Sequence, residues 1–127
     1  MTEYQGRLLA NTLSAVPVIV LGSASSTFLG VVRGLGRRNI PVIGLSSSSP
    51  DKSVNRSRYL TRLFTIDNWE ALPLKLMLEN IREDFGDPSR MVVLPANDAS
   101  LLAYNQLRGQ LDPCFCDSLP AAQMILA

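Results

Sequence analysis

The stretch VIVLGSASSTFLGVVRGLGRRNIPVIGL, residues 18–45, decides the fold class. It opens with the continuous apolar run Val18–Leu21, which is typical of a strand buried on both faces. After a Gly/Ser turn, apolar residues recur at helical spacing over residues 27–38. The helix is expected to stop before Pro41, because a residue that precedes proline avoids the α region. A second apolar strand, Pro41–Leu45, completes a β-α-β unit of the kind found in parallel sheets.

The rest of the chain continues this alternation. We predict strands at Tyr59–Ile66 and Met91–Leu94, helices at 69–85, 99–110 and 119–127, and a linker at Asp112–Asp117. The predicted fold is an α/β, Rossmann-like three-layer domain with a four-stranded, mostly parallel sheet in the order 3-2-1-4. Residues 1–16 are expected to form an N-terminal extension and residues 17–127 the domain.

The apolar patterns also predict which side of two helices is buried. In the helix over residues 27–38 we expect Gly30 and Gly34 to face the sheet, with Arg33 and Arg37 in water. The helix over residues 69–85 should begin after a cap at Asp67 or Asn68. It is expected to bury several apolar side chains, namely Leu72, Leu76, Ile81 and Phe85.

Composition excludes several classes of chemistry. The 127 residues carry a net charge of +1, which gives no indication of a nucleic-acid or anionic-membrane partner. Histidine is absent, so Ser-His-Asp, Cys-His and His-containing metal sites are excluded. Cys114 and Cys116 are too few for a structural zinc site, so we expect no metal and reduced thiols in the cytoplasm. No apolar run approaches the ~20 residues that span a bilayer, so no membrane association is expected.

The expected strand order places a topological switch point between the first and fourth strands. Open α/β sheets bind ligands at such a point, at the carboxyl ends of the strands. Three polar clusters fall there: Gly22–Ser26, Ser46–Ser49 and Asn97–Asp98. The first cluster precedes a helix N-terminus, which favours a carboxylate or phosphate. The same residues could equally form only a turn and a cap, and the sequence leaves both interpretations open.

Common nucleotide motifs are absent from this turn. A dinucleotide-binding fold needs GxGxxG and an acid after the second strand, whereas the chain has GSASST and then Leu45-Ser46. Serines with Arg56 could imitate a 2′-phosphate site, but an NADP-dependent enzyme is the least favoured interpretation. A P-loop is excluded because no lysine follows the turn.

Three segments together resemble the N-terminal, pre-ATP-grasp domain of the ATP-grasp carboxylate–amine ligases. They are PVIVLGSASSTFLGVVRGLGRRNIPVIGL (17–45), SRYLTRLFTI (57–66) and VVLPANDAS (92–100). The resemblance covers residues 17 to about 126, and it rests on the order and spacing of the segments. The family often has an acid after the second strand, where this chain has Leu45-Ser46.

The resemblance implies a domain that borders the substrate cleft of an ATP-dependent ligase, which converts a carboxylate to an acyl phosphate for attack by an amine. The positions that it places at the cleft are Gly22, Ser23, Ser25, Ser26, Asn97 and Asp98. Arg56 and Arg58 are assigned a supporting role, and Arg58 is expected to pair with Asp98 or another loop acid.

In such ligases ATP and Mg²⁺ bind to further domains downstream. The resemblance therefore implies no catalytic residue and no cofactor in this chain, which we expect to be a truncated fragment and inactive alone. Its expected partners are the downstream ATP-grasp domains, a small carboxylate substrate and a second copy of the chain, contacted through an apolar patch that includes Leu119, Met124 and Ile125. The alternative is a free-standing, non-catalytic Rossmann-like domain that binds a small anion or nucleotide.

Overall fold

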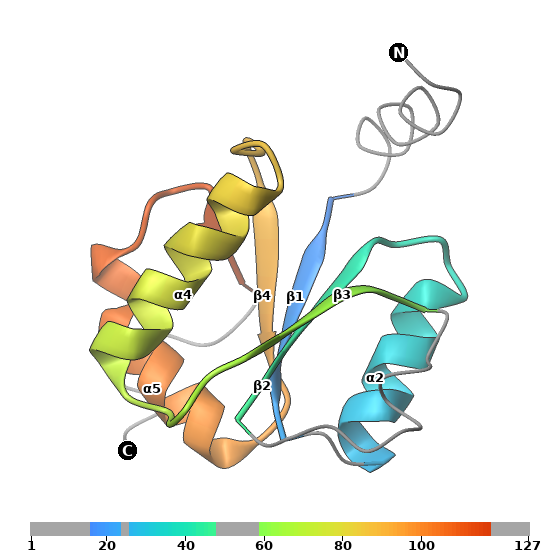
Figure 1. Cartoon of the computed structure of the whole chain (residues 1–127), viewed down its shortest axis with the longest axis horizontal. Coiled ribbons are helices and arrows are strands. Elements are labelled where there is room, and N and C mark those ends of the chain that lie inside the picture. The colour runs from blue at the N-terminus through green and yellow to red at the C-terminus, as the bar shows by residue number, and fades with distance from the viewer. Residues whose placement is uncertain (1–15, 24–25, 48–58, 118–127) are drawn as a thin grey trace.

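A parallel five-stranded sheet with helices on both faces forms the centre of the molecule (Figure 1). The computed structural model describes residues 16–23, 26–47 and 59–117. The strands are β1 (Val18–Gly22), β2 (Val42–Ser46), β3 (Leu60–Thr65), β4 (Met91–Pro95) and β5 (Phe115–Cys116), in the spatial order β3-β2-β1-β4-β5. The helices are α2 (Ser26–Gly36), α4 (Ala71–Asp84) and α5 (Asp98–Leu107), followed by the 3-10 turn η1 (Arg108–Gln110).

The predicted α/β class is confirmed, but the number of strands is wrong. The sheet has five strands, not four, so its order differs from the expected 3-2-1-4 by the added strand β5 beside β4. This strand lies in the segment that we expected to be a linker. Its two residues, Phe115 and Cys116, pair in parallel with Met91 and Val92. So short a strand has no periodicity that a sequence could display, and only the adjacent edge of β4 defines it.

The two faces of β1 contribute to two separate apolar clusters. Ile19 and Leu21 belong to the cluster covered by α4 and α5, whereas Val18 and Val20 belong to the cluster covered by α2. Figure 1 shows α2 on one side of the sheet and both α4 and α5 on the other. The central position of β1 therefore explains why its sequence is a continuous apolar run.

Helix α2 packs on the sheet through a different face from the one predicted. Phe28 and Val32 are buried, whereas Gly30 and Gly34 are exposed and a Cβ added to either would meet no atom within 4 Å. Each glycine follows one of these buried residues by two positions, which is about 200° around a helix. The two glycines therefore face solvent. Arg33, and Arg37 just after the end of the helix, are also exposed, as predicted.

The buried face of α4 also differs from the predicted one. Leu72 and Leu76 are 65% and 57% exposed, whereas the alternate residues Leu74 and Leu78 are fully buried with Ile81. The sequence LPLKLML offers leucines to both sides of the helix, so apolar periodicity could not select between them. The helix begins at Ala71, and its N-cap is Glu70, which makes no side-chain capping bond, rather than Asp67 or Asn68.

Two other expectations fall outside the described residues: the extension over residues 1–16, of which only residue 16 is described, and the last helix over 119–127. Within the described ranges, no helix combines the length and the apolar character needed to span a bilayer.

Candidate functional site

The switch point of the sheet lies between β1 and β4. These strands pair in parallel, with Val20 beside Leu94 and Leu21 beside Pro95. After β1 the chain runs to α2 on one face of the sheet, and after β4 it runs to α5 on the other face (Figure 1). Because the two connections diverge, their first residues border the crevice where open α/β sheets bind ligands.

Asn97 joins the two sides of this crevice. It is the N-cap of α5, and its side-chain oxygen accepts a hydrogen bond of 2.9 Å from the backbone N–H of Ser100. Its amide nitrogen donates to Oγ of Ser23, across a distance of 3.4 Å. The capping bond fixes which end of the amide is the donor. Because the Ser23 hydroxyl accepts this bond, its own proton remains available to an acceptor in the crevice.

Gly22 ends β1 without an unusual backbone conformation. Among the described glycines only Gly86 has a positive φ. A Cβ added to Gly22 would lie 3.5 Å from Cβ of Ala96 and 3.6 Å from Phe28, which are ordinary contacts. The carbonyl of Gly22 accepts a bond of 3.2 Å from the N–H of Ser47. Gly22 therefore brings the β1 and β2 connections together at the crevice, and its φ does not require glycine.

The remaining predicted site residues are only partly described. Asp98 is exposed in the first turn of α5, and Ser23 is exposed beside Asn97. Ser25, Arg56, Arg58 and the side chain of Ser26 lie outside the described residues, and so does the expected pairing of Arg58 with Asp98. The structure thus brings together Ser23 and Asn97, with Gly22 and Asp98 as their chain neighbours.

A half-buried polar network, which the sequence analysis missed, holds the end of β5 to α5. The Tyr104 hydroxyl donates to Asp117 Oδ2 at 2.6 Å, and Arg108 donates to Asp117 Oδ1 at 3.0 Å. Burial, and then the hydrogen bond and charge of Asp117, raise the pKa of Tyr104 well above its usual value of 10.0. Tyr104 therefore stays neutral and serves as a structural donor. The four-residue spacing between Tyr104 and Arg108, the C-cap of α5, was the only sign of this network in the sequence.

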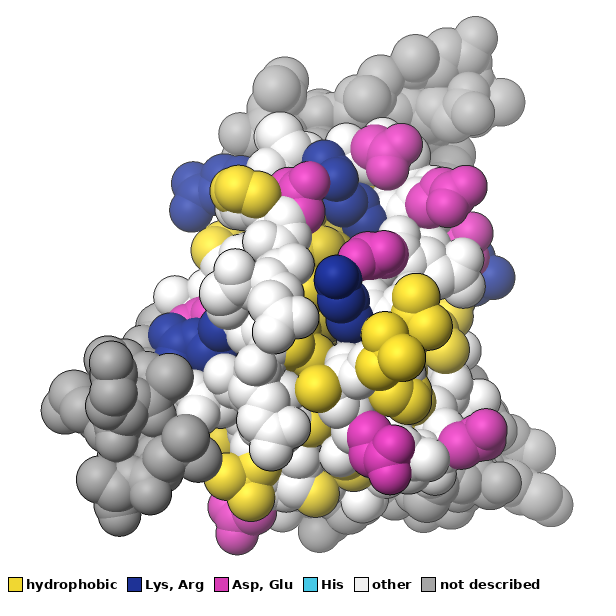
Figure 2. All heavy atoms as spheres, turned by 90° about the vertical axis from the view of Figure 1, so that its left-hand side faces the viewer, with side chains coloured by type: hydrophobic (Ala, Val, Ile, Leu, Met, Phe, Trp, Pro, Cys, Tyr) yellow, Lys and Arg dark blue, Asp and Glu magenta, His cyan; other side chains and the backbone are white. Residues whose placement is uncertain are grey.

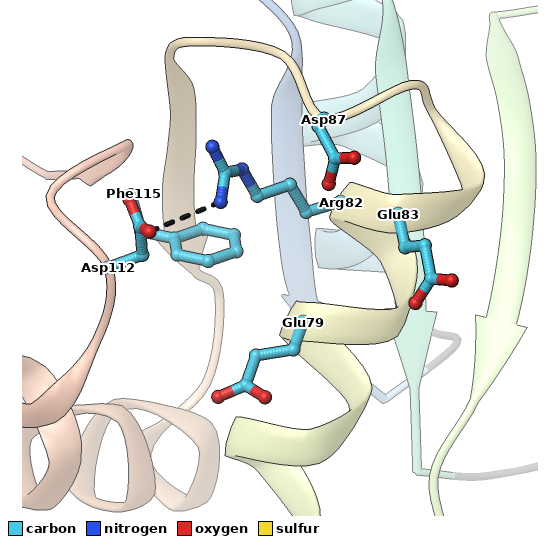
Figure 3. A pocket seen from close by; sticks show the side chains of 6 residues that line it. All are labelled: Glu79, Arg82, Glu83, Asp87, Asp112 and Phe115. Atoms are coloured by element: carbon cyan, nitrogen blue, oxygen red, sulfur yellow. Dashed lines mark hydrogen bonds and ion pairs between the residues drawn. The ribbon is translucent and has the colours of Figure 1, made fainter.

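A pocket of about 370 Å³ lies at the end of the sheet opposite to the crevice, beside the amino ends of β4 and β5 (Figure 3). It is lined by Glu79, Arg82, Glu83, Asp87, Asp112 and Phe115. Arg82 pairs with Asp112 at 3.2 Å and also donates to the carbonyl of Pro88. The backbone N–H of Cys114, and then Arg82, lower the pKa of Asp112. Because most of its lining side chains are acidic, this pocket is a poor site for a carboxylate or a phosphate, the ligands that we expect at the crevice.

No protein-family model matches the chain, and the search of curated proteins gave no match. The resemblance to the ligases therefore rests on the three quoted segments.

Proposed function

We propose that this domain holds a small carboxylate at the crevice between β1 and β4, as the substrate-cleft domain of an ATP-dependent carboxylate–amine ligase. The observation that carries the proposal is the contact between Asn97 and Ser23 at the switch point. It leaves hydrogen-bond donors, the Ser23 hydroxyl and the second amide proton of Asn97, available to an acceptor. Such donors, next to the positive end of α5, favour a carboxylate over a cation.

The position of Asp98 supports an amino acid as the carboxylate. Its exposed side chain has no ion pair within the described part of the chain, and it directly follows Asn97. A carboxylate bound by Ser23 and Asn97 would place an α-ammonium group within reach of Asp98. The carboxylate of the amino acid would then accept hydrogen bonds from Ser23 and Asn97, and its ammonium group would donate to Asp98.

We propose that ATP and Mg²⁺ bind to domains downstream of this chain, as the resemblance to the ligases implies. Residues 16–23, 26–47 and 59–117 contain no group of three or more His, Cys, Asp or Glu side chains that could hold a metal ion. Lys75, on α4, is the single lysine of those ranges. We therefore assign phosphoryl transfer to the downstream domains of the proposed ligase, and to this chain only the binding and orientation of the carboxylate.

The test is a titration of isotope-labelled protein followed by NMR, with acetate, glycine, L-alanine and Mg-ATP as separate ligands. We expect the carboxylates to shift the amide signals around Ser23 and Asn97 and to leave the pocket at the other end of the sheet unaffected. Asn97→Asp is the informative variant, because Asp also caps helices but brings a negative charge and no donor toward Ser23. Carboxylate binding should be lost, with a change in unfolding free energy below about 0.5 kcal/mol.

Two results would contradict the proposal. One is wild-type protein without carboxylate-dependent shifts at the crevice, and the other is unchanged carboxylate affinity in Asn97→Asp. Shifts produced by Mg-ATP alone at the crevice would favour the free-standing nucleotide-binding domain. Turnover of ATP by this chain alone would overturn the assignment of phosphoryl transfer to other domains.

A further inference from the structure

The indole N–H of Trp69 is a buried donor without an acceptor among the described residues. Its Nε1 is shielded from solvent, and it is the one buried side-chain nitrogen or oxygen of the described ranges that makes no hydrogen bond. Buried polar groups in native proteins are nearly always hydrogen-bonded, and an unmade bond costs free energy that an acceptor would recover. A half-buried tryptophan ordinarily finds a partner for its N–H or turns it to water, whereas Trp69 is half-buried with its N–H inside.

Trp69 lies at the same edge of the sheet as the crevice, in the connection between β3 and α4. Backbone hydrogen bonds join the strand ends along this edge. The N–H of Ile66 donates to the carbonyl of Ser46 at 2.9 Å, and the N–H of Ala96 donates to the carbonyl of Leu21 at 2.7 Å. The carboxyl ends of β3 and β2, and those of β1 and β4, are thereby held together at the edge where the predicted ligand binds.

Helices α4 and α5 both begin at this edge. They follow the carboxyl ends of parallel strands, cover the same face of the sheet and contact each other (Figure 1). Figure 2 looks onto the side of the molecule that these two helices form. Trp69 precedes α4, and Asn97 is the N-cap of α5. Trp69 packs against the apolar cluster of this face, which includes Leu21 and Leu45 near the ends of β1 and β2. The cluster that supports the indole therefore reaches the strand ends that border the crevice.

The separation of the two places sets the length of a ligand that reaches both. β3 lies two strands away from β1, which is about 10 Å at the usual spacing of strands. An α-carboxylate held by Ser23 and Asn97 would leave Trp69 out of reach of a ligand as short as glycine or alanine. A longer side chain that ends in an acceptor covers the remaining distance, because the indole also extends from its backbone onto the apolar face.

The charges beside Trp69 favour a neutral acceptor. Asp67 and Glu70 are exposed, and neither has an ion pair within the described ranges. Two uncompensated carboxylates so close to the indole repel a carboxylate at the end of the ligand's side chain. The carbonyl oxygen of a carboxamide accepts a hydrogen bond without adding charge.

We propose that Trp69 determines the specificity of the crevice, and that its N–H donates to the side-chain carboxamide of a bound amino acid of the length of glutamine. This inference rests on the proposed function, because Ser23 and Asn97 hold the α-carboxylate of the same ligand. Since Nε1 is shielded in this structure, binding must turn the ring or part the side chains around it. The ring is only half-buried and belongs to a connection, so this movement breaks no hydrogen bond of a helix or strand.

The test is an NMR titration of isotope-labelled protein, in which Trp69, the only tryptophan of the chain, gives a single indole N–H signal. L-Glutamine is compared with L-norleucine, whose side chain has a similar length and no acceptor, and with L-glutamate, whose acceptor is charged. All three should shift the backbone signals of Ser23 and Asn97. L-Glutamine should also move the indole proton downfield, and it should bind about tenfold more tightly than either of the others.

Trp69→Phe keeps an aromatic ring and removes the N–H. This variant should bind L-glutamine no more tightly than L-norleucine, with the affinity that the wild type has for L-norleucine. Tyr104→Phe is the matched control, because it removes an aromatic donor from the second half of α5, and its tenfold preference should remain. Glu70→Gln should raise the affinity for L-glutamate; Glu70 makes no side-chain capping bond, so the helix is unaffected.

Failure of this inference can be distinguished from failure of the proposed function. If the ligands shift Ser23 and Asn97 but leave the indole signal in place, the inference is overturned and the carboxylate site stands. If no ligand shifts Ser23 or Asn97, both fail. An equal indole shift with L-norleucine, or a tenfold preference that survives in Trp69→Phe, would also overturn the inference. If circular dichroism shows that Trp69→Phe does not fold, the wild-type indole signal with the three ligands decides the question.

Discussion

Gly36→Ala should destabilise the domain, although alanine is the better helix former. Gly36 is the last residue of α2, and it lies against Tyr59, the residue that precedes β3. A Cβ added there would lie 2.5 Å from both Cβ and Cδ1 of Tyr59, and 2.7 Å from its Cγ. The Cβ of Tyr59 is bonded directly to the backbone, so rotation of the Tyr59 side chain cannot move it away from the new methyl group. The segment leading into β3 must therefore move.

The size of the effect follows from the overlap. Ordinary carbon contacts begin at 3.4 Å, so Tyr59 must move by about 1 Å, and overpacking of this kind costs about 1–3 kcal/mol. The helix propensity of alanine offsets at most about 1 kcal/mol, and less at a helix end. We expect a net loss of about 1–2 kcal/mol in the free energy of unfolding.

Gly30→Ala is the matched control in the same helix. Gly30 is exposed and an added Cβ would meet no atom within 4 Å, so only the propensity term remains. This change should increase the free energy of unfolding by about 0.5–1 kcal/mol. The two glycine-to-alanine changes should therefore have opposite signs.

Urea denaturation followed by circular dichroism, at low protein concentration, measures both values. The reasoning is refuted if Gly36→Ala is as stable as the wild type, because Tyr59 would then accommodate the methyl group without cost. It is also refuted if Gly30→Ala destabilises the domain, because that glycine would then face the sheet.

Three further predictions test the packing and the titrating groups. Leu74→Ala should cost about 2–5 kcal/mol in urea denaturation, whereas Leu76→Ala should change stability by less than about 0.5 kcal/mol; equal effects would contradict the observed face of α4. Because Tyr104 has a pKa raised in the folded state, its contribution to stability is complete below pH 10.0 and decreases as the pH rises above that value. In Tyr104→Phe this part of the alkaline destabilisation should be absent from urea titrations at increasing pH. Burial raises the pKa of Cys114, so iodoacetamide should label it more slowly than the half-exposed Cys116, as followed by peptide mass spectrometry; the reverse order would count against the burial.

The candidate crevice could be located from the sequence because its position depends on topology. Once Val18–Leu21 and Met91–Leu94 are identified as parallel strands, the residues after them must lie at the same edge of the sheet. The contact that joins Ser23 to Asn97 was not predictable, because it spans 74 positions and depends on how Asn97 caps its helix.

The sequence by itself determined the α/β class, the strands β1 to β4 and the three helices α2, α4 and α5. Continuous apolar runs, a Gly/Ser turn and apolar residues at helical spacing depend on neighbouring residues, so they are visible along the chain. Tertiary structure decided which face each helix buries and where the sheet ends. Leu72 and Leu74 are equally apolar, and only packing against β1 and its neighbours makes one exposed and the other buried. Phe115 becomes part of a strand only because the edge of β4 offers unpaired backbone groups to it.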